Sequence, residues 1–233
     1  MGWLGEVLKV LFGLDEEQRA WRDQVAAAEH HLRWGAESRT ARDFERVLET
    51  LAQCPASDPP AAGYLHRREH AAAEAHRWLA RLALDGIRDQ AAKSAERFQA
   101  REEGRRSLLA QIGAARERVR QLEADGSLIS AREERRRLEE MERQARELPD
   151  LAAEKRAGHA AVFGRLAPVF AEHRREAGSR LVAWRAVAGL VAEDQAARDE
   201  LAREFEAALA ALDADWKALS AAAPPPPAGG RGQ

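Results

Sequence analysis

Two stretches in the middle of the chain carry apolar residues at spacings that alternate between four and three positions. This spacing places apolar side chains along one face of a helix and is typical of a coiled-coil seam. The seam residues are Leu108, Ile112, Ala115, Val119, Leu122, Leu138, Met141, Ala145, Leu148 and Ala152. The turn signal ADGS separates the two stretches. The pattern therefore predicts an antiparallel coiled-coil hairpin with its tip near residues 125–127.

The rest of the chain also carries helix signals, interrupted by a few breakers. A short helical region is expected over 15–54, and the Pro-rich stretch CPASDPPAAG predicts a loop over 55–63. A bundle of long helices is expected over 64–220, followed by a disordered Ala/Pro/Gly tail over 221–233. Asp85-Gly86 is a candidate break, and Gly178-Ser179 is a candidate start for the last helix; the sequence leaves both open.

The opening stretch MGWLGEVLKVLFGL is amphipathic when placed on a helix. Its apolar side chains cover one broad face, whereas Glu6, Lys9 and three glycines lie on the remainder. The candidate membrane- or partner-binding residues are Trp3, Leu4, Val7, Leu8, Leu11, Phe12 and Leu14. Such a helix either lies in the headgroup plane of a bilayer or packs against a protein surface, the protein's own core included.

Other interpretations of this stretch fit poorly. A secretory signal would carry Lys or Arg before an unbroken apolar run and a small-residue cleavage site after it. A membrane-spanning helix needs about 20 apolar residues, and this chain becomes highly charged after Leu14. Myristoylation of Gly2 would favour Ser or Thr where Glu6 stands. A peripheral contact is therefore the functional expectation for residues 1–14.

A short amphipathic N-terminal helix followed by long charged helices resembles the architecture of phage-shock-protein A and the ESCRT-III membrane-remodelling proteins. The likeness rests on MGWLGEVLKVLFGL and on the hairpin, and it implies membrane binding and self-assembly. The chain departs from that pattern at CPASDPPAAG, which interrupts the place of an early long hairpin, and in the mid-chain position of its own hairpin.

Composition narrows the fold and the partners. The 233 residues are rich in Ala, Leu, Arg and Glu and poor in Ile, Thr and Tyr, which predicts an all-α, elongated helical bundle. The net charge is −2, and residues 94–150 contain 13 Arg against 13 Asp plus Glu. This balance argues against nucleic acid as a partner.

The single Cys54 excludes an intrachain disulfide, so a cytoplasmic location is expected, with the inner face of the membrane as an alternative. The excess of Arg and Ala is typical of proteins encoded by GC-rich genomes and gives the chain a bacterial-like composition.

One motif keeps an enzymatic interpretation open. His66-Arg67-Arg68-Glu69-His70 matches the H-x-x-E-H pattern of inverzincin metalloproteases, with Glu74 one turn further along. Two imidazoles and a carboxylate on one helix face are ligands that zinc accepts. Those proteases use large α/β domains, however, and this sequence predicts no strand.

The expectation that emerges is a non-enzymatic helical protein with no cofactor. We expect it to bind a membrane surface peripherally through its N-terminal helix, and either to self-assemble into a homo-oligomer or to act as a scaffold. A soluble coiled-coil adaptor, whose N-terminal helix docks on a protein partner, is the alternative. A zinc-dependent hydrolase using His66, Glu69 and His70 is the third and least favoured interpretation.

Overall fold

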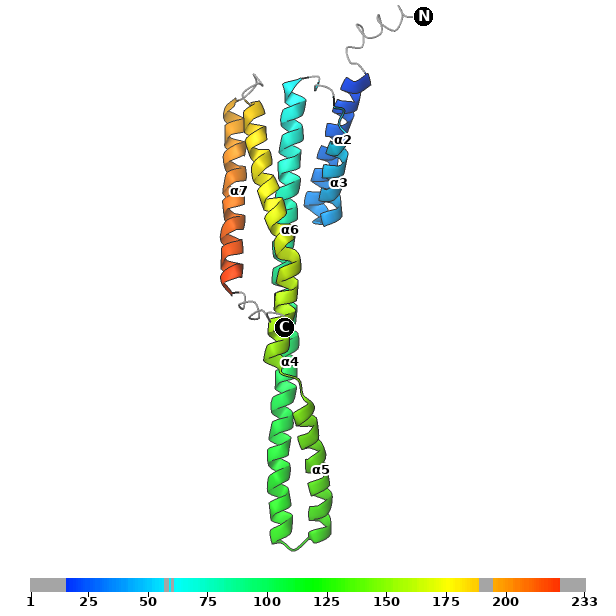
Figure 1. Ribbon diagram of the computed structural model, residues 1–233, viewed down its shortest axis with the longest axis vertical. Helices are drawn as coiled ribbons and strands as arrows, with labels where there is room; N and C mark the ends of the chain where they lie inside the picture. Colours follow the sequence, from blue (N-terminus) through cyan, green and yellow to red (C-terminus); the bar gives the residue numbers. More distant parts are fainter. Residues whose placement is uncertain (1–15, 57–58, 60, 189–194, 223–233) are drawn as a thin grey trace, which may run out of the picture. The chain divides into compact units, whose positions relative to one another are not determined.

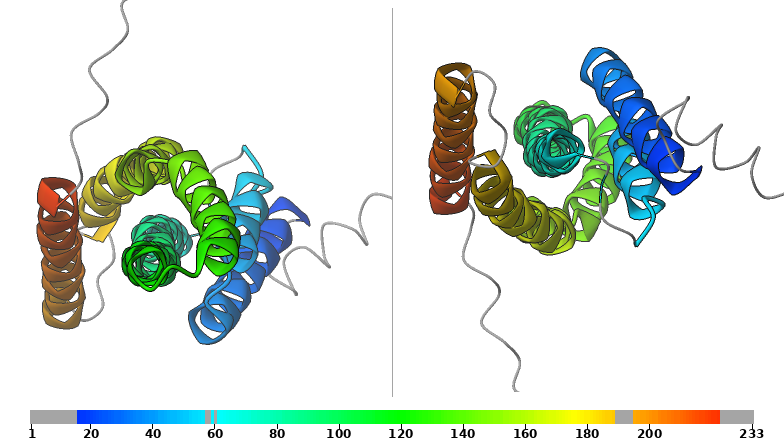
Figure 2. Two further views of the ribbon diagram at one scale, coloured as in Figure 1. Left: turned by 90° about the horizontal axis from the view of Figure 1, so that it is seen from below. Right: turned by 90° about the horizontal axis from the view of Figure 1, so that it is seen from above.

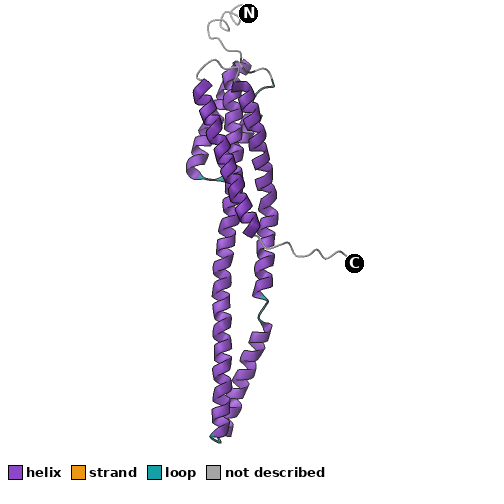
Figure 3. Ribbon diagram, turned by 90° about the vertical axis from the view of Figure 1, so that its left-hand side faces the viewer, coloured by secondary structure: helices purple, strands orange, loops and turns teal. Residues whose placement is uncertain are grey.

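The computed structural model describes residues 16–56, 59, 61–188 and 195–222. These residues are helical throughout, apart from short turns, and contain no strand (Figure 3), which confirms the all-α prediction. The described helices are α2 (Glu16–Ser38), α3 (Ala41–Ala52), α4 (Ala62–Ala124), α5 (Leu128–Glu147), α6 (Leu151–Ala188) and α7 (Gln195–Ala222). The predicted amphipathic helix over 1–14 lies outside the described residues. So does the predicted disordered tail over 221–233, except for residues 221 and 222, which are helical and end α7.

The chain divides into two compact units. Among the described residues, unit 1 combines those between 16 and 87 with those between 164 and 222, and unit 2 contains Arg88–Phe163. The sequence predicts one bundle of long helices over 64–220, and in the structure these residues are divided between the two units. The helices α4 and α6 each contribute residues to both units.

Unit 1 is organised around the first part of α4, which packs other helices on two sides (Figures 1 and 2). On one side, α4 packs against α6 and α7. The core there contains Ala73, Ala80, Ala83, Leu84, Phe170, Ala177, Leu181, Trp184, Ala202, Phe205, Leu209 and Leu212. On the other side it packs against α2 and α3. That second core contains Ala28, Phe44, Val47, Leu51, Ala71, Ala72, Ala75 and Leu79. Small alanines on α4 admit large neighbours, and the stacked rings of Phe44 and Trp78 lie 5.5 Å apart.

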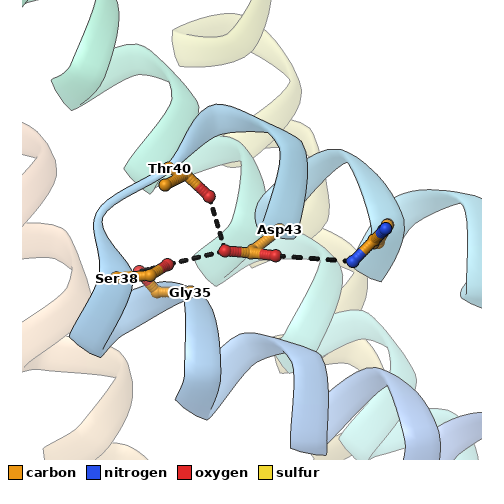
Figure 4. A network of polar contacts seen from close by, with 5 residues as sticks. Gly35, Ser38, Thr40 and Asp43 are labelled. Carbon is orange, nitrogen blue, oxygen red and sulfur yellow. Dashed lines mark hydrogen bonds and ion pairs between the residues drawn. The ribbon is translucent and has the colours of Figure 1, made fainter.

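A buried carboxylate fixes the junction between α2 and α3 (Figure 4). Arg39 adopts a left-handed backbone conformation (φ 53°) that ends α2, and its N–H donates to the carbonyl of Gly35. The Asp43 Oδ2 atom then accepts hydrogen bonds from Ser38 Oγ at 2.6 Å and Thr40 Oγ1 at 2.5 Å. The hydrogen bond from Ser38, and to a lesser extent the one from Thr40, lowers the pKa of Asp43 below its ordinary value of 3.8.

Two positions that the sequence leaves open prove to be continuous helix. The helix α4 passes through Asp85-Gly86 because Leu84 and Ile87 on either side are buried. Likewise, α6 continues through Gly178-Ser179, so the last helix does not begin at this candidate start. Burial of apolar side chains on both sides of each glycine outweighs the helix penalty of about 1 kcal/mol per glycine. The last described helix begins instead at Gln195.

The hairpin of unit 2 has its turn where the heptad pattern predicts it. The helix α4 ends at Ala124 and α5 begins at Leu128, and between them Gly126 takes a positive φ of 73°. The Ser127 N–H donates to the carbonyl of Leu122 at 2.9 Å, which caps the end of α4. Ion pairs between the helices, among them Arg116–Glu142 at 2.7 Å, show that α4 and α5 run antiparallel side by side.

Candidate functional site

The residues that the sequence analysis assigns to membrane or partner contact, Trp3 to Leu14, lie outside the described residues. The part of the chain that is described has no helix that is both long and apolar enough to cross a membrane. The structure therefore bears on the other two candidates, the hairpin seam and the H-x-x-E-H motif.

The hairpin brings most of the predicted seam residues together. Ile112, Ala115 and Val119 of α4 are buried, and so is Ala131 of α5, near the tip of the hairpin. The partly buried seam residues are Leu108, Leu122, Leu138, Met141 and Ala145. A hairpin of two helices thus covers its seam incompletely.

The sequence assigns Leu148 to the seam, and the structure corrects this assignment. It follows the last residue of α5, has an extended backbone (ψ 128°) and is 40% exposed. The cause is the next residue, Pro149, whose ring excludes the helical conformation from the residue before it.

Open grooves run along the hairpin. One, of about 610 Å³, is lined by Ala114, Ala115 and Met141 and bordered by side chains of both charges, including Arg118 and Glu140. Another, of about 480 Å³, has Leu109, Ile112 and Ala145 in its wall, with Arg116 and Glu142 at its border. Both grooves combine a small apolar floor with balanced charge.

The H-x-x-E-H residues lie on α4, and the carboxylate of this motif, Glu69, forms ion pairs with two arginines. Glu69 is 4% exposed. Its Oε2 accepts from Arg180 Nη1 of α6 at 2.9 Å, and its Oε1 lies 3.4 Å from Arg68 Nη1. A carboxylate held by two guanidinium groups serves as the centre of a helix–helix ion pair rather than as a general base open to substrate.

The two histidines of the motif both contact Trp184 of α6. Trp184 Nε1 donates a hydrogen bond to His66 Nε2, and the His70 ring centroid lies 4.6 Å from that of Trp184. Burial, with a smaller contribution from the positive charge of Arg198, lowers the pKa of His66 to about 4. Burial also lowers the pKa of His70.

A second histidine contact joins the same two helices. His76 Nδ1 on α4 and His173 Nδ1 on α6 lie 3.0 Å apart, so one ring donates and the other accepts. Burial and the neighbouring His173 lower the pKa of His76 to about 4, and burial lowers the pKa of His173. At neutral pH these four imidazoles are therefore uncharged.

No group of three or more His, Cys, Asp or Glu side chains among the described residues is arranged to hold a metal ion. The spacing of the motif is enough to predict that His66, Glu69 and His70 lie near one another on a helix. What sequence spacing cannot supply is the set of partners, Trp184 and Arg180, which lie more than 100 residues further along the chain. The sequence signal for these contacts is the set of histidine and glutamate residues among the alanines of α4, which indicates polar side chains in a tightly packed helix.

Comparisons with protein families, with curated proteins and with solved structures found no match to this chain.

Proposed function

We propose that this protein is a non-enzymatic helical protein that binds membrane surfaces peripherally through residues 2–14 and self-assembles through its coiled-coil hairpin. The observation that carries the proposal is the opening stretch itself. Placed on a helix, its seven large apolar side chains would share one face, and aromatic residues stand near both ends of the stretch, at Trp3 and Phe12. Aromatic and leucine side chains on one face of a short helix are what the headgroup–acyl boundary of a bilayer accommodates.

The charge of this stretch specifies the kind of membrane contact. Glu6 and Lys9 are its only ionisable side chains, so the polar face has no cationic strip for anionic lipid. Apolar insertion therefore supplies most of the attachment. Binding should be similar on neutral and anionic vesicles and should change little with salt.

The interpretation as a binding protein is supported by the state of the H-x-x-E-H motif. A hydrolase of that type needs its glutamate free to move a proton and its histidines free to bind metal. Here Glu69 is held by Arg180, and His66 accepts the indole N–H of Trp184. These contacts join helices, which is the ordinary use of such groups in a bundle.

Self-assembly is supported by the incompletely covered hairpin. The grooves beside α4 and α5 have small apolar floors, and their borders carry both Arg and Glu. Such a surface is complementary to a partner that also presents both charges around apolar residues. A second copy of the hairpin, itself close to neutral, has this composition. Ala114→Glu would place a charge in the larger groove and is expected to lower the associated mass in sedimentation equilibrium. Ala100→Glu, at an exposed position of α4 away from both grooves, is the matched control.

The membrane proposal is tested by liposome co-sedimentation of the full-length chain and of a chain lacking residues 1–14. The full-length protein should pellet with neutral and anionic vesicles alike, and the shortened protein should stay in the supernatant. Trp3→Glu and Phe12→Asp should abolish pelleting while leaving the far-UV circular dichroism unchanged. If the full-length protein does not pellet and the shortened protein melts at a lower temperature, the stretch belongs to the core or to a protein interface. The soluble adaptor then becomes the better interpretation.

A further inference from the structure

Four of the seven histidines gather where α4 meets α6 in unit 1. His66, His70 and His76 lie on α4. His66 and His70 contact Trp184 of α6, and His76 contacts His173 of α6. We call these four residues the histidine seam. The seam lies against the core that α4 forms with α6 and α7, where Trp184 is 1% exposed.

The contacts of this seam depend on imidazole lone pairs. The indole N–H of Trp184 is a donor only, so His66 Nε2 can accept from it only while that nitrogen carries no proton. Protonation of His66 would place two N–H donors opposite each other. A buried donor without an acceptor costs about 1–3 kcal/mol, so the contact changes from favourable to unfavourable.

The pair of His76 and His173 follows the same logic with one additional step. A first proton can enter the donating ring at its Nε2, which leaves the shared hydrogen bond in place. A second proton must enter the accepting Nδ1, which removes the lone pair and places two cations in contact at 3.0 Å. The pair therefore tolerates one proton and is broken by two.

Charged groups from every neighbouring helix face the seam. Arg198 of α7 lies near His66, and Arg77, Glu74 and Glu29 lie near His70. Near the pair of His76 and His173 are Arg180, Glu172, Glu176 and, from α3, Glu45. The carboxylates favour protonation and the guanidiniums oppose it, but burial is the largest effect for all four imidazoles and lowers each pKa.

We propose that the histidine seam is an acid-sensitive latch, whose protonation releases α6 and α7 from α4 and exposes the core between them. The direction of opening follows from the distribution of histidines. The hydrogen bonds Trp184–His66 and His76–His173 both join α4 to α6, whereas the core that α4 forms with α2 and α3 is built from apolar residues such as Phe44, Val47 and Leu51. Acid therefore acts on the α6 side first.

The pH range follows from linkage. An exposed histidine takes up its proton near pH 6.5, whereas His66 and His76 hold their neutral form in the closed bundle down to about pH 4. Between these values the released form binds more protons than the closed form, so closure weakens as pH falls. Two such groups change the closure constant by about 100-fold per pH unit. The loss is complete once pH falls below about 4. This latch is independent of residues 2–14 and goes beyond the membrane proposal.

The test is an acid titration of the full-length chain from pH 7.5 to 4. Near-UV circular dichroism and binding of an apolar dye report the core around Trp184, and far-UV circular dichroism reports helix content. The expected result is loss of the near-UV signal and gain of dye binding between pH 6.5 and 4, while most helix content remains. In the triple variant His66→Gln, His76→Gln and His173→Gln, the amide oxygens still accept hydrogen bonds but do not titrate. Its transition should move down by at least about one pH unit, as expected for the removal of two linked protons.

His30→Gln is the matched control, because His30 is an exposed histidine of α2 in the same unit. It should leave the transition unchanged. The proposal is overturned if the triple variant opens at the same pH as the wild-type chain. A second measurement holds even if the triple variant does not fold: NMR titration of the imidazoles in the wild-type chain. Ordinary titration of His66 and His76 near pH 6.5, with no change at Trp184, would equally exclude the latch.

Discussion

Arg180 Nη1 of α6 donates to Glu69 Oε2 of α4 across 2.9 Å, and the side chain of Glu69 is only 6% exposed. Glu69→Ala should lower the free energy of unfolding by about 2 kcal/mol. Breaking a fully buried pair costs about 3–5 kcal/mol, and the value here is smaller because Arg180, at 37% exposure, can regain water. Urea denaturation measures the loss, and a double-mutant cycle with Arg180→Ala isolates the coupling. Exposed Glu49→Ala is the control; an equal cost for both variants would contradict the structural role of the pair.

Gly35 gives the second prediction, since it lies where α2 passes closest to a buried ring. A Cβ at this position would stand 2.9 Å from Phe44 Cε1, and Phe44 has no exposed surface. Gly35→Ala should therefore destabilise unit 1 by about 1–3 kcal/mol through overpacking, although alanine favours helix. Gly164→Ala in α6, which meets nothing within 4 Å, should stabilise the chain by up to about 1 kcal/mol. Thermal melts of the two variants should shift in opposite directions.

The hairpin turn gives a prediction about backbone conformation alone. Gly126 has a φ of 73° with open space around it, so a side chain added there meets strain rather than collision. Gly126→Ala should destabilise the hairpin by about 1–2 kcal/mol, and Gly126→Asn by less, because asparagine tolerates the left-handed region. Hydrogen exchange at the start of α5 measures the effect. Ser127→Ala should be nearly neutral, since the Ser127 side chain makes no capping hydrogen bond; an equal loss in both variants would contradict this account.

Asp43 predicts an effect in a more acidic range than the histidines. The hydroxyls of Ser38 and Thr40 stabilise its ionised form and hold its pKa below 3.8. The stability that Asp43 contributes is therefore present above pH 3.8 and is lost as pH falls through the lowered folded pKa. Asp43→Asn should lower the melting temperature at pH 7, and the difference from wild type should narrow below pH 3.8. A difference that stays constant down to pH 2 would show that the ionised carboxylate is not what stabilises the junction.

The features that the sequence predicts well are those set by local pattern. The spacing of Leu108, Ile112 and Val119 and the turn at Gly126 depend only on residues close in the chain, and the hairpin follows from them. Composition alone is enough for the all-α fold, because no segment offers the alternating β-branched residues of a strand. Leu148 shows the limit even of local pattern: its spacing fits the seam, but Pro149 takes it out of the helix.

The contacts that the sequence does not predict depend on residues far apart in the chain. His66 and Glu69 match a zinc motif by spacing, and only the packing of α6 against α4 shows that their partners are Trp184 and Arg180. The pairing of His76 with His173 is likewise fixed by tertiary packing, with 97 positions between them. The role of Gly178 also depends on tertiary packing, since this glycine continues a helix that the core around Trp184 stabilises.

The buried alanines of α4 imply an uneven tolerance of sequence change. Where α4 lies between two cores, Ala71, Ala73 and Ala75 have no exposed surface, and any larger side chain would push against a neighbouring helix. In α5, by contrast, Ala131 is the one buried residue among the 20 of that helix. Most positions of α5 need only a good helix former with a balanced charge. Over evolutionary time the exposed positions of α5 outside the grooves are therefore free to change while the helix persists, and the alanine-lined face of α4 is where a lineage would keep its residues.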